Sequence, residues 1–153
     1  MNADYINPFL KGTINVLKTM AMMEPLPGKP YLKDEGAFSG DISGVIGITG
    51  ATEGSMAVSF SESCILKIVS NMLGEEYTEM NPDIVDAVGE ITNMISGDAR
   101  RILGELGISL EASIPTVIRG SGHILEHVAN SPTIIIPFDT SHGEFTVEIC
   151  FVR

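Results

Sequence analysis

The order of its helical and strand-like segments constrains the fold of this chain more than any other feature of the sequence. Three segments combine an apolar spacing of three to four residues with residue types that start helices. They open at Asn7 with Pro8, at Ser61, and at Asn81 with Pro82, and they end before the breaker cluster at residues 26–30, at Gly74, and near Gly104 or Gly107.

The segments between and after these helices have the alternation and residue types of β-strands. The predicted strands are two that turn near residues 50–54 within Phe38–Phe60, then Ser109–Ile118, Ser131–Phe138 and Glu144–Phe151, with His123–His127 as a candidate addition and a hairpin turn at His142 and Gly143. In this order, one helix is followed by strands and then two helices are followed by further strands. Such an order favours an antiparallel sheet over alternating parallel units. The sequence therefore predicts one α+β domain over residues 1–153, with two layers in which an antiparallel sheet packs against helices.

Charge and cysteine content exclude several classes of function. The 20 acidic and 9 basic residues give a net charge of −11, which disfavours binding to nucleic acid or to anionic membranes. Cys64 and Cys150 lie in apolar runs without the spacing of a zinc site or a disulfide scaffold, so we expect structural thiols. Neither a secretory signal nor a spanning segment is recognisable, which predicts a cytoplasmic protein.

The long third helix separates an apolar face from a polar one. At about 100° per residue one arc gathers the predicted core positions, which are Ile84, Val85, Val88, Ile91, Ile95, Ala99, Ile102 and Leu106. Asp86, Glu90, Asn93 and Gly97 fall on the opposite side, with Glu90 and Asn93 only about 60° apart. Polar residues on an exposed helix face usually do no more than keep it solvated. Asn is a poor helix former, however, and Gly89 and Gly97 beside the pair would let another backbone approach.

The stretch Asp86–Gly97, with Glu90 and Asn93 in a Glu-x-x-Asn pattern, resembles the signature of the CheC/CheX/FliY chemotaxis phosphatases. Further segments resemble the CheX type in the same order along the chain: residues 6–9, 28–31, 59–63, 72–76 and 134–138, with Pro115 downstream of the signature. CheC-type members carry two signatures. Here Gly12 stands where the first-helix acid would be, three residues before Asn15, so the resemblance implies one site per chain and a CheC-like fold.

The resemblance implies an enzyme that removes the phosphoryl group from the aspartyl phosphate of a CheY-like response regulator. By that resemblance Asn93 orients the attacking water and Glu90 pairs with a lysine of the regulator, while Asp86 and Gly97 belong to the docking face. We expect no cofactor and no metal in this chain, because the regulator supplies the Mg²⁺.

Two other interpretations stay open at this point. A non-catalytic module of the same fold could dock response regulators or flagellar switch components, although such a module has no need of Glu90 and Asn93. A metal pair at His123 and His127 lacks a third ligand. We also predict a homodimer, because the apolar strand Glu144–Phe151 would be an exposed sheet edge in a monomer and because the CheX type pairs through its sheets.

Overall fold

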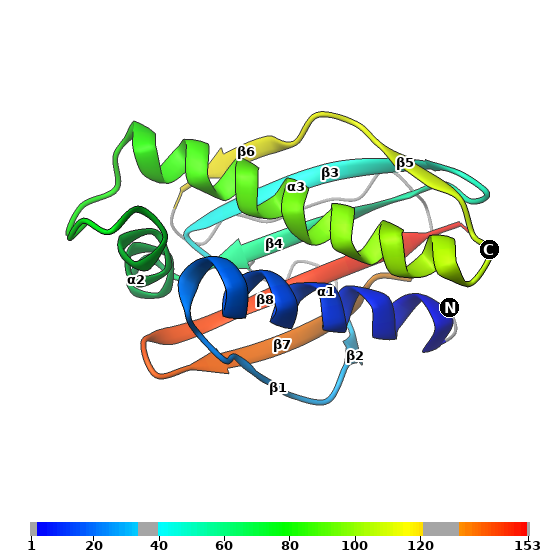
Figure 1. Cartoon of the computed structure of the whole chain (residues 1–153), viewed down its shortest axis with the longest axis horizontal. Coiled ribbons are helices and arrows are strands. Elements are labelled where there is room, and N and C mark those ends of the chain that lie inside the picture. The colour runs from blue at the N-terminus through cyan, green and yellow to red at the C-terminus, as the bar shows by residue number, and fades with distance from the viewer. Residues whose placement is uncertain (1–2, 34–39, 121–131, 153) are drawn as a thin grey trace.

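The computed structural model describes residues 3–33, 40–120 and 132–152 (Figure 1). Within these ranges lie three helices: α1 (Ala3–Ala21), α2 (Glu62–Leu73) and α3 (Pro82–Glu105). The same ranges contain eight strands: β1 (Leu26–Pro27), β2 (Tyr31–Leu32), β3 (Ile42–Gly50), β4 (Gly54–Phe60), β5 (Leu110–Ala112), β6 (Thr116–Arg119), β7 (Ile134–Thr140) and β8 (Gly143–Phe151).

The strands form one antiparallel sheet in the order β1-β7-β8-β4-β3-β5, in which β2 also pairs with β7 and β6 also pairs with β3. Helices α1 and α3 lie side by side across one face of this sheet, and α2 lies at one end (Figure 1). The predicted two-layer α+β architecture is confirmed. Its antiparallel connectivity follows from the hairpins β3–β4 and β7–β8, which turn as the glycines near residue 50 and at Gly143 predicted.

The core lies between the helices and the sheet. On β4 and β8 alternate side chains point toward the helices, and Phe60 and Phe145 from these strands pack with ring centroids 5.3 Å apart. The opposite face of the sheet carries small and polar side chains that are also buried. There Ser43 and Ser59 share a hydrogen bond of 2.7 Å, and Lys33 forms an ion pair of 2.8 Å with Glu148.

The first helix begins earlier than its sequence pattern predicts. Asn7 is not its N-cap, because the helix already runs from Ala3 and Pro8 lies inside it. Pro8 is the sixth residue of this helix and cannot donate to the carbonyl of Asp4, so the turn before it lacks one backbone hydrogen bond. Tertiary packing supports that turn, since Tyr5 stacks on Phe151 with ring centroids 5.1 Å apart. Local start signals could not reveal this contact with the far end of the chain.

The start of α2 is at the predicted residue but uses a different capping group. Ser61 has the extended backbone of an N-cap, yet its hydroxyl donates to the carbonyl of Glu144 and caps nothing. The carboxylate of Asp41 instead accepts from the backbone N–H of Glu62 at 2.8 Å. At the other end Gly74 adopts the left-handed conformation, with φ of 69°, as predicted.

Two predictions about the strands need correction. Ser109–Ile118 is not one strand but two, β5 and β6, which pair with opposite ends of β3 and are separated by a short loop. The strand predicted at Glu144–Phe151 is present as β8, but it is not an edge, because it lies between β7 and β4. The argument for a homodimer from an exposed C-terminal strand is therefore wrong, and the sheet edges are the short strands at its two ends.

The remaining sequence predictions concern cysteines, histidines and membrane segments. Both Cys64 and Cys150 are buried free thiols, as expected. The candidate strand at His123–His127 and the metal pair considered at the same two histidines lie outside the described residues. No helix within the described ranges is sufficiently long and apolar to span a bilayer.

Candidate functional site

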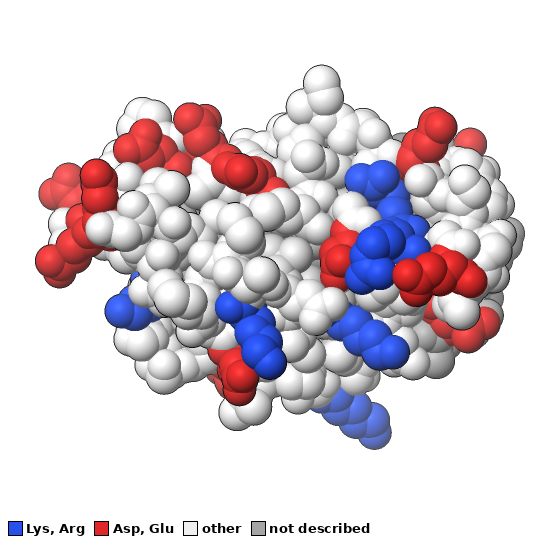
Figure 2. Space-filling model, in the orientation of Figure 1, with Lys and Arg blue, Asp and Glu red and all other residues white. Residues whose placement is uncertain are grey.

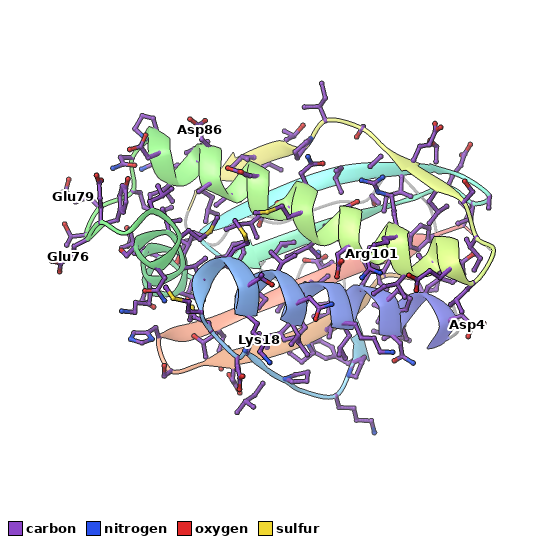
Figure 3. All side chains as sticks on the ribbon, in the orientation of Figure 1. Asp4, Lys18, Glu76, Glu79, Asp86 and Arg101 are labelled. Atoms are coloured by element: carbon purple, nitrogen blue, oxygen red, sulfur yellow. The ribbon has the colours of Figure 1, made fainter. Side chains whose placement is uncertain are left out.

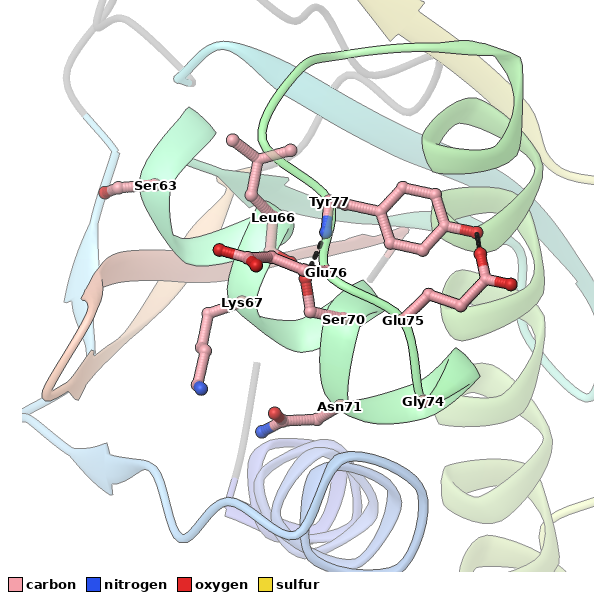
Figure 4. Close-up of a pocket in the computed structure, with 9 residues that line it drawn as sticks. All are labelled: Ser63, Leu66, Lys67, Ser70, Asn71, Gly74, Glu75, Glu76 and Tyr77. Atoms are coloured by element: carbon pink, nitrogen blue, oxygen red, sulfur yellow. Dashed lines mark hydrogen bonds between the residues drawn. The ribbon is translucent and has the colours of Figure 1, made fainter.

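Helix α3 carries the predicted site, and local contacts fix where it begins. The side chain of Asn81 accepts from the N–H of Ile84 at 3.1 Å, which is the predicted N-cap. The preceding loop is held by Tyr77, whose backbone N–H donates to Ser70 at 2.9 Å and whose hydroxyl donates to Glu75 at 3.3 Å (Figure 4). The same hydroxyl also lies 3.3 Å from a carboxylate oxygen of Asp83. Desolvation, followed by these two negative charges, raises the pKa of Tyr77, so the hydroxyl stays a donor.

Close packing against β3 and α1 fixes the distance of α3 from the sheet and its rotation about its own axis. At Gly44 of β3, an added Cβ would lie 2.9 Å from the Cβ of Thr92, so only glycine allows the helix to come this near to the sheet. At Gly12 of α1, an added Cβ would lie 3.2 Å from backbone atoms of Ile95 and Ala99. A glycine inside a predicted strand, such as Gly44, is the sequence signal that could have revealed this close approach.

The fixed rotation turns the predicted site residues outward. Asp86, Glu90 and Asn93 are exposed, and Gly97 is half-buried. Figure 3 shows Asp86 projecting from the first half of α3, and Arg101 lies on the second half. Within the described part of the chain, the side chains of Glu90 and Asn93 make no hydrogen bond or ion pair. Both are therefore available to a partner.

Most of the apolar arc predicted for α3 is buried. Ile84, Val88, Ile91, Ile95 and Ala99 are buried, while Val85 and Ile102 are half-buried. Leu106 was wrongly assigned to the core: it is 60% exposed, because it is the C-cap, where the backbone has left the helix. Leu103, which the arc omitted, is fully buried instead.

Negative charge surrounds the first half of α3. Figure 2 shows acidic side chains gathered at the end of the molecule where α2 and α3 meet, and the exposed acids of this region are Glu75, Glu76, Glu79, Asp83, Asp86 and Glu90. Asp86 and Glu90 are four residues apart, a spacing at which like charges on a helix repel by about 0.2–0.5 kcal/mol. A cation that approaches Glu90 would relieve this repulsion.

The two glycines beside the pair differ in their surroundings. An added Cβ at Gly89 would lie 3.5 Å from Val117 of β6, so this position faces the same chain and not an incoming partner. At Gly97 the nearest atom is Nη2 of Arg100, at 3.7 Å, and the surface above is open to solvent. Of the two, only Gly97 fits the predicted role of admitting a partner's backbone.

The corresponding positions of α1 do not form a second pair. Gly12 is packed against α3, and the side chain of Asn15 donates to Asp98 at 3.1 Å. Asp98 in turn accepts from Arg101, which also pairs with Glu105. Asn15 therefore belongs to a network that ties the two helices together, whereas Asn93 has no such partner.

Glu90 and Asn93 are exposed on α3, and neither lines the hollow described next. An open polar hollow between α2 and its following loop is lined by residues such as Lys67, Ser70 and Glu76 but not by the pair (Figure 4). No cluster of three His, Cys, Asp or Glu side chains suited to a metal occurs among the residues that the structure describes. Small-molecule sites are concave, so a projecting pair suits a protein surface that has a recess of its own.

Comparison with known proteins gives consistent matches. Residues 42–139 match the family model for the chemotaxis phosphatase CheX. The CheY-P phosphatase CheX of Thermotoga maritima is 34% identical over 121 residues, which are 78% of this chain and 78% of that protein.

Two solved structures share the fold over almost the full chain. A CheC-like superfamily protein from Shewanella sp. PV-4 is 44% identical, with a TM-score of 0.94 over all of both chains. A CheX–CheY–BeF3–Mg²⁺ complex from Borrelia burgdorferi contains a chain that is 26% identical, with a TM-score of 0.82 over 97% of this chain and 98% of that one.

Proposed function

The chain belongs to the CheX family of chemotaxis phosphatases, and on that premise we propose that it hydrolyses the aspartyl phosphate of a CheY-like response regulator. The observation that carries this proposal is the pair Glu90 and Asn93, which is exposed on α3 and has no partner among the described residues. The solved complex of the Borrelia burgdorferi relative supports a regulator as the partner.

Asn93 orients the attacking water. Its carboxamide offers both an acceptor and two donors, so it can hold a water in line with the phosphorus. The water oxygen forms a bond to phosphorus while the bond from phosphorus to the aspartyl oxygen breaks. The products are inorganic phosphate and the free aspartate of the regulator. Mg²⁺ bound by the regulator would offset the developing negative charge, so this chain need not supply a metal.

Glu90 sets the register of docking. It lies one turn before Asn93 and pairs with a lysine beside the regulator's phosphorylated aspartate. The repulsion between Asp86 and Glu90 favours this pairing, and the open surface at Gly97 leaves room for the regulator's backbone. The anchored α3 holds both side chains at a fixed spacing, which a water-positioning mechanism requires.

The test separates the two residues. Asn93→Ala should slow phosphate release on the order of 100-fold while the regulator still binds, and Glu90→Ala should weaken binding as well as the rate. Both substitutions should change stability by no more than about 0.5 kcal/mol, because the side chains are exposed. Phosphate release, together with pull-down of a regulator that carries beryllofluoride, distinguishes the two effects.

Matched controls exist on the same two helices. Asn15→Ala removes an exposed asparagine from α1, and Glu105→Ala removes an exposed glutamate from the end of α3. Each should retain turnover close to that of the wild type. If Asn93→Ala also retains it, the water-positioning role is wrong and a non-catalytic docking module becomes the better account.

A homodimer stays a prediction that now rests on the family resemblance alone.

A further inference from the structure

The loop between β5 and β6 presents one isoleucine to solvent. Ile114 is 89% exposed, the largest value among the exposed large hydrophobic residues of the described chain. A single exposed apolar side chain is common on protein surfaces and means little by itself. Its significance depends on how rigidly it is held and on what lies beside it.

The backbone on both sides of Ile114 is restrained. The N–H of Ser113 donates to the carbonyl of Gly47 at 2.9 Å, and the N–H of Gly47 donates to the hydroxyl of Ser113 at 3.0 Å. On the other side, Pro115 restricts Ile114 to extended conformations. The side chain is thus held outward before any partner arrives, and little conformational entropy remains to be lost on binding.

The loop flanks α3 on the side away from α1 (Figure 1). Its two strands pair with β3 at Ile48 and at Val45, so Ile114 lies opposite the stretch of β3 between them. Helix α3 crosses the same strand, with Thr92 over Gly44. Figure 2 shows an uncharged bulge at this place, next to the acidic start of α3.

A partner that reaches Asn93 must cover more than the exposed side of α3. Specific protein interfaces bury roughly 800 Å² on each partner, which is far wider than one helix turn. On the α1 flank, Asn15, Asp98 and Arg101 already satisfy one another. On the other flank stands the preformed apolar residue, an aliphatic side chain that can fill a pocket on a partner.

We propose that Ile114 is a docking residue for the response regulator, seated in an apolar recess beside the regulator's phosphorylation site. This inference rests on the proposed function, and it adds an apolar contact to the polar pair. Ile114 takes no part in the chemistry. It sets how tightly the regulator is held, and the rate of the bound complex depends on Asn93.

The test is Ile114→Ser, with Leu26→Ser as the matched control. Leu26 is 70% exposed in β1, at the opposite edge of the sheet. With a CheY-like regulator carrying beryllofluoride and Mg²⁺, Ile114→Ser should raise Kd and KM about 10-fold, which corresponds to about 1.4 kcal/mol, and should change kcat by less than about two-fold. Ile114→Leu should restore binding, and the control should bind like the wild type.

Three outcomes would overturn the inference. Ile114→Ser could bind as tightly as the control, it could lose kcat with unchanged KM, or it could alter only the sedimentation of the free protein, which would assign Ile114 to a contact between copies. Thermal melting of both variants shows that they fold. Failure of the proposed function is distinct, because the wild type would then bind the regulator without releasing phosphate.

Discussion

Replacing Gly44 by alanine tests how closely α3 must lie on the sheet. The added Cβ would be 2.9 Å from the Cβ of Thr92, whereas carbon atoms in optimal contact are about 3.5–4.0 Å apart. Rotation of the Thr92 side chain cannot relieve this contact, because a Cβ does not move with χ1. The helix must therefore move away from β3 by at least about 0.6 Å, the difference between these separations.

The expected cost follows from the burial of this contact. Overpacking a well-packed core costs about 1–3 kcal/mol, and Gly44 and Thr92 are both buried. We expect Gly44→Ala to lose about 2 kcal/mol, which lowers Tm by about 4–8 °C in a chain of this size. Phosphate release should fall more than stability explains, because Asn93 follows Thr92 directly and shifts with it.

Gly47→Ala is the control in the same strand. Its added Cβ would meet only the side chain of Ser113, 3.2 Å from the hydroxyl, and that side chain can adjust. Because Ser113 also restrains the loop of Ile114, the phosphate release of this control is compared at saturating regulator. Urea melts and phosphate release of the two variants, measured below the melting temperature of each, give the comparison. If both variants melt equally and Gly44→Ala keeps full activity, this glycine does not set the distance between α3 and the sheet.

Two further predictions concern Gly97 and Cys64. Gly97→Ala should stabilise the fold by up to about 1 kcal/mol, because alanine is the better helix former, yet it should reduce phosphate release if the regulator's backbone comes close. Gly104→Ala is the control, because nothing lies within 4 Å of its added Cβ. It should give the same gain in stability without a loss of phosphate release. Burial raises the pKa of Cys64 from 9.0 to about 11, against a smaller opposing effect of its hydrogen bond to Thr140. Between these values the unfolded thiol loses its proton while the folded one keeps it, so stability should fall by about 2 kcal/mol as the pH rises from 9 to 11. Urea melts across this range should show that loss, and Cys64→Ala should lack it; an identical slope in that variant would contradict the assignment.

The sequence by itself determined the segments and the orientation of the polar pair. Periodicity and cap residues placed α2 and α3, since Asn81 and Gly74 act through neighbours only a few residues away. The exposure of Glu90 and Asn93 also followed from the sequence, because the angle between two helix positions is a local property and the apolar arc fixes which side faces inward. Family resemblance added the roles proposed for the pair.

Tertiary structure alone decided the features that depend on distant residues. The start of α1 depends on Tyr5 against Phe151, and the cap of α2 comes from Asp41. The interior place of β8 depends on which strands pair, which apolar alternation does not specify. The same limit applies to the site: the sequence shows that Asn93 faces outward, but only the packing of Thr92 on Gly44 determines how far it projects, because that distance is set by two backbones brought together by the fold.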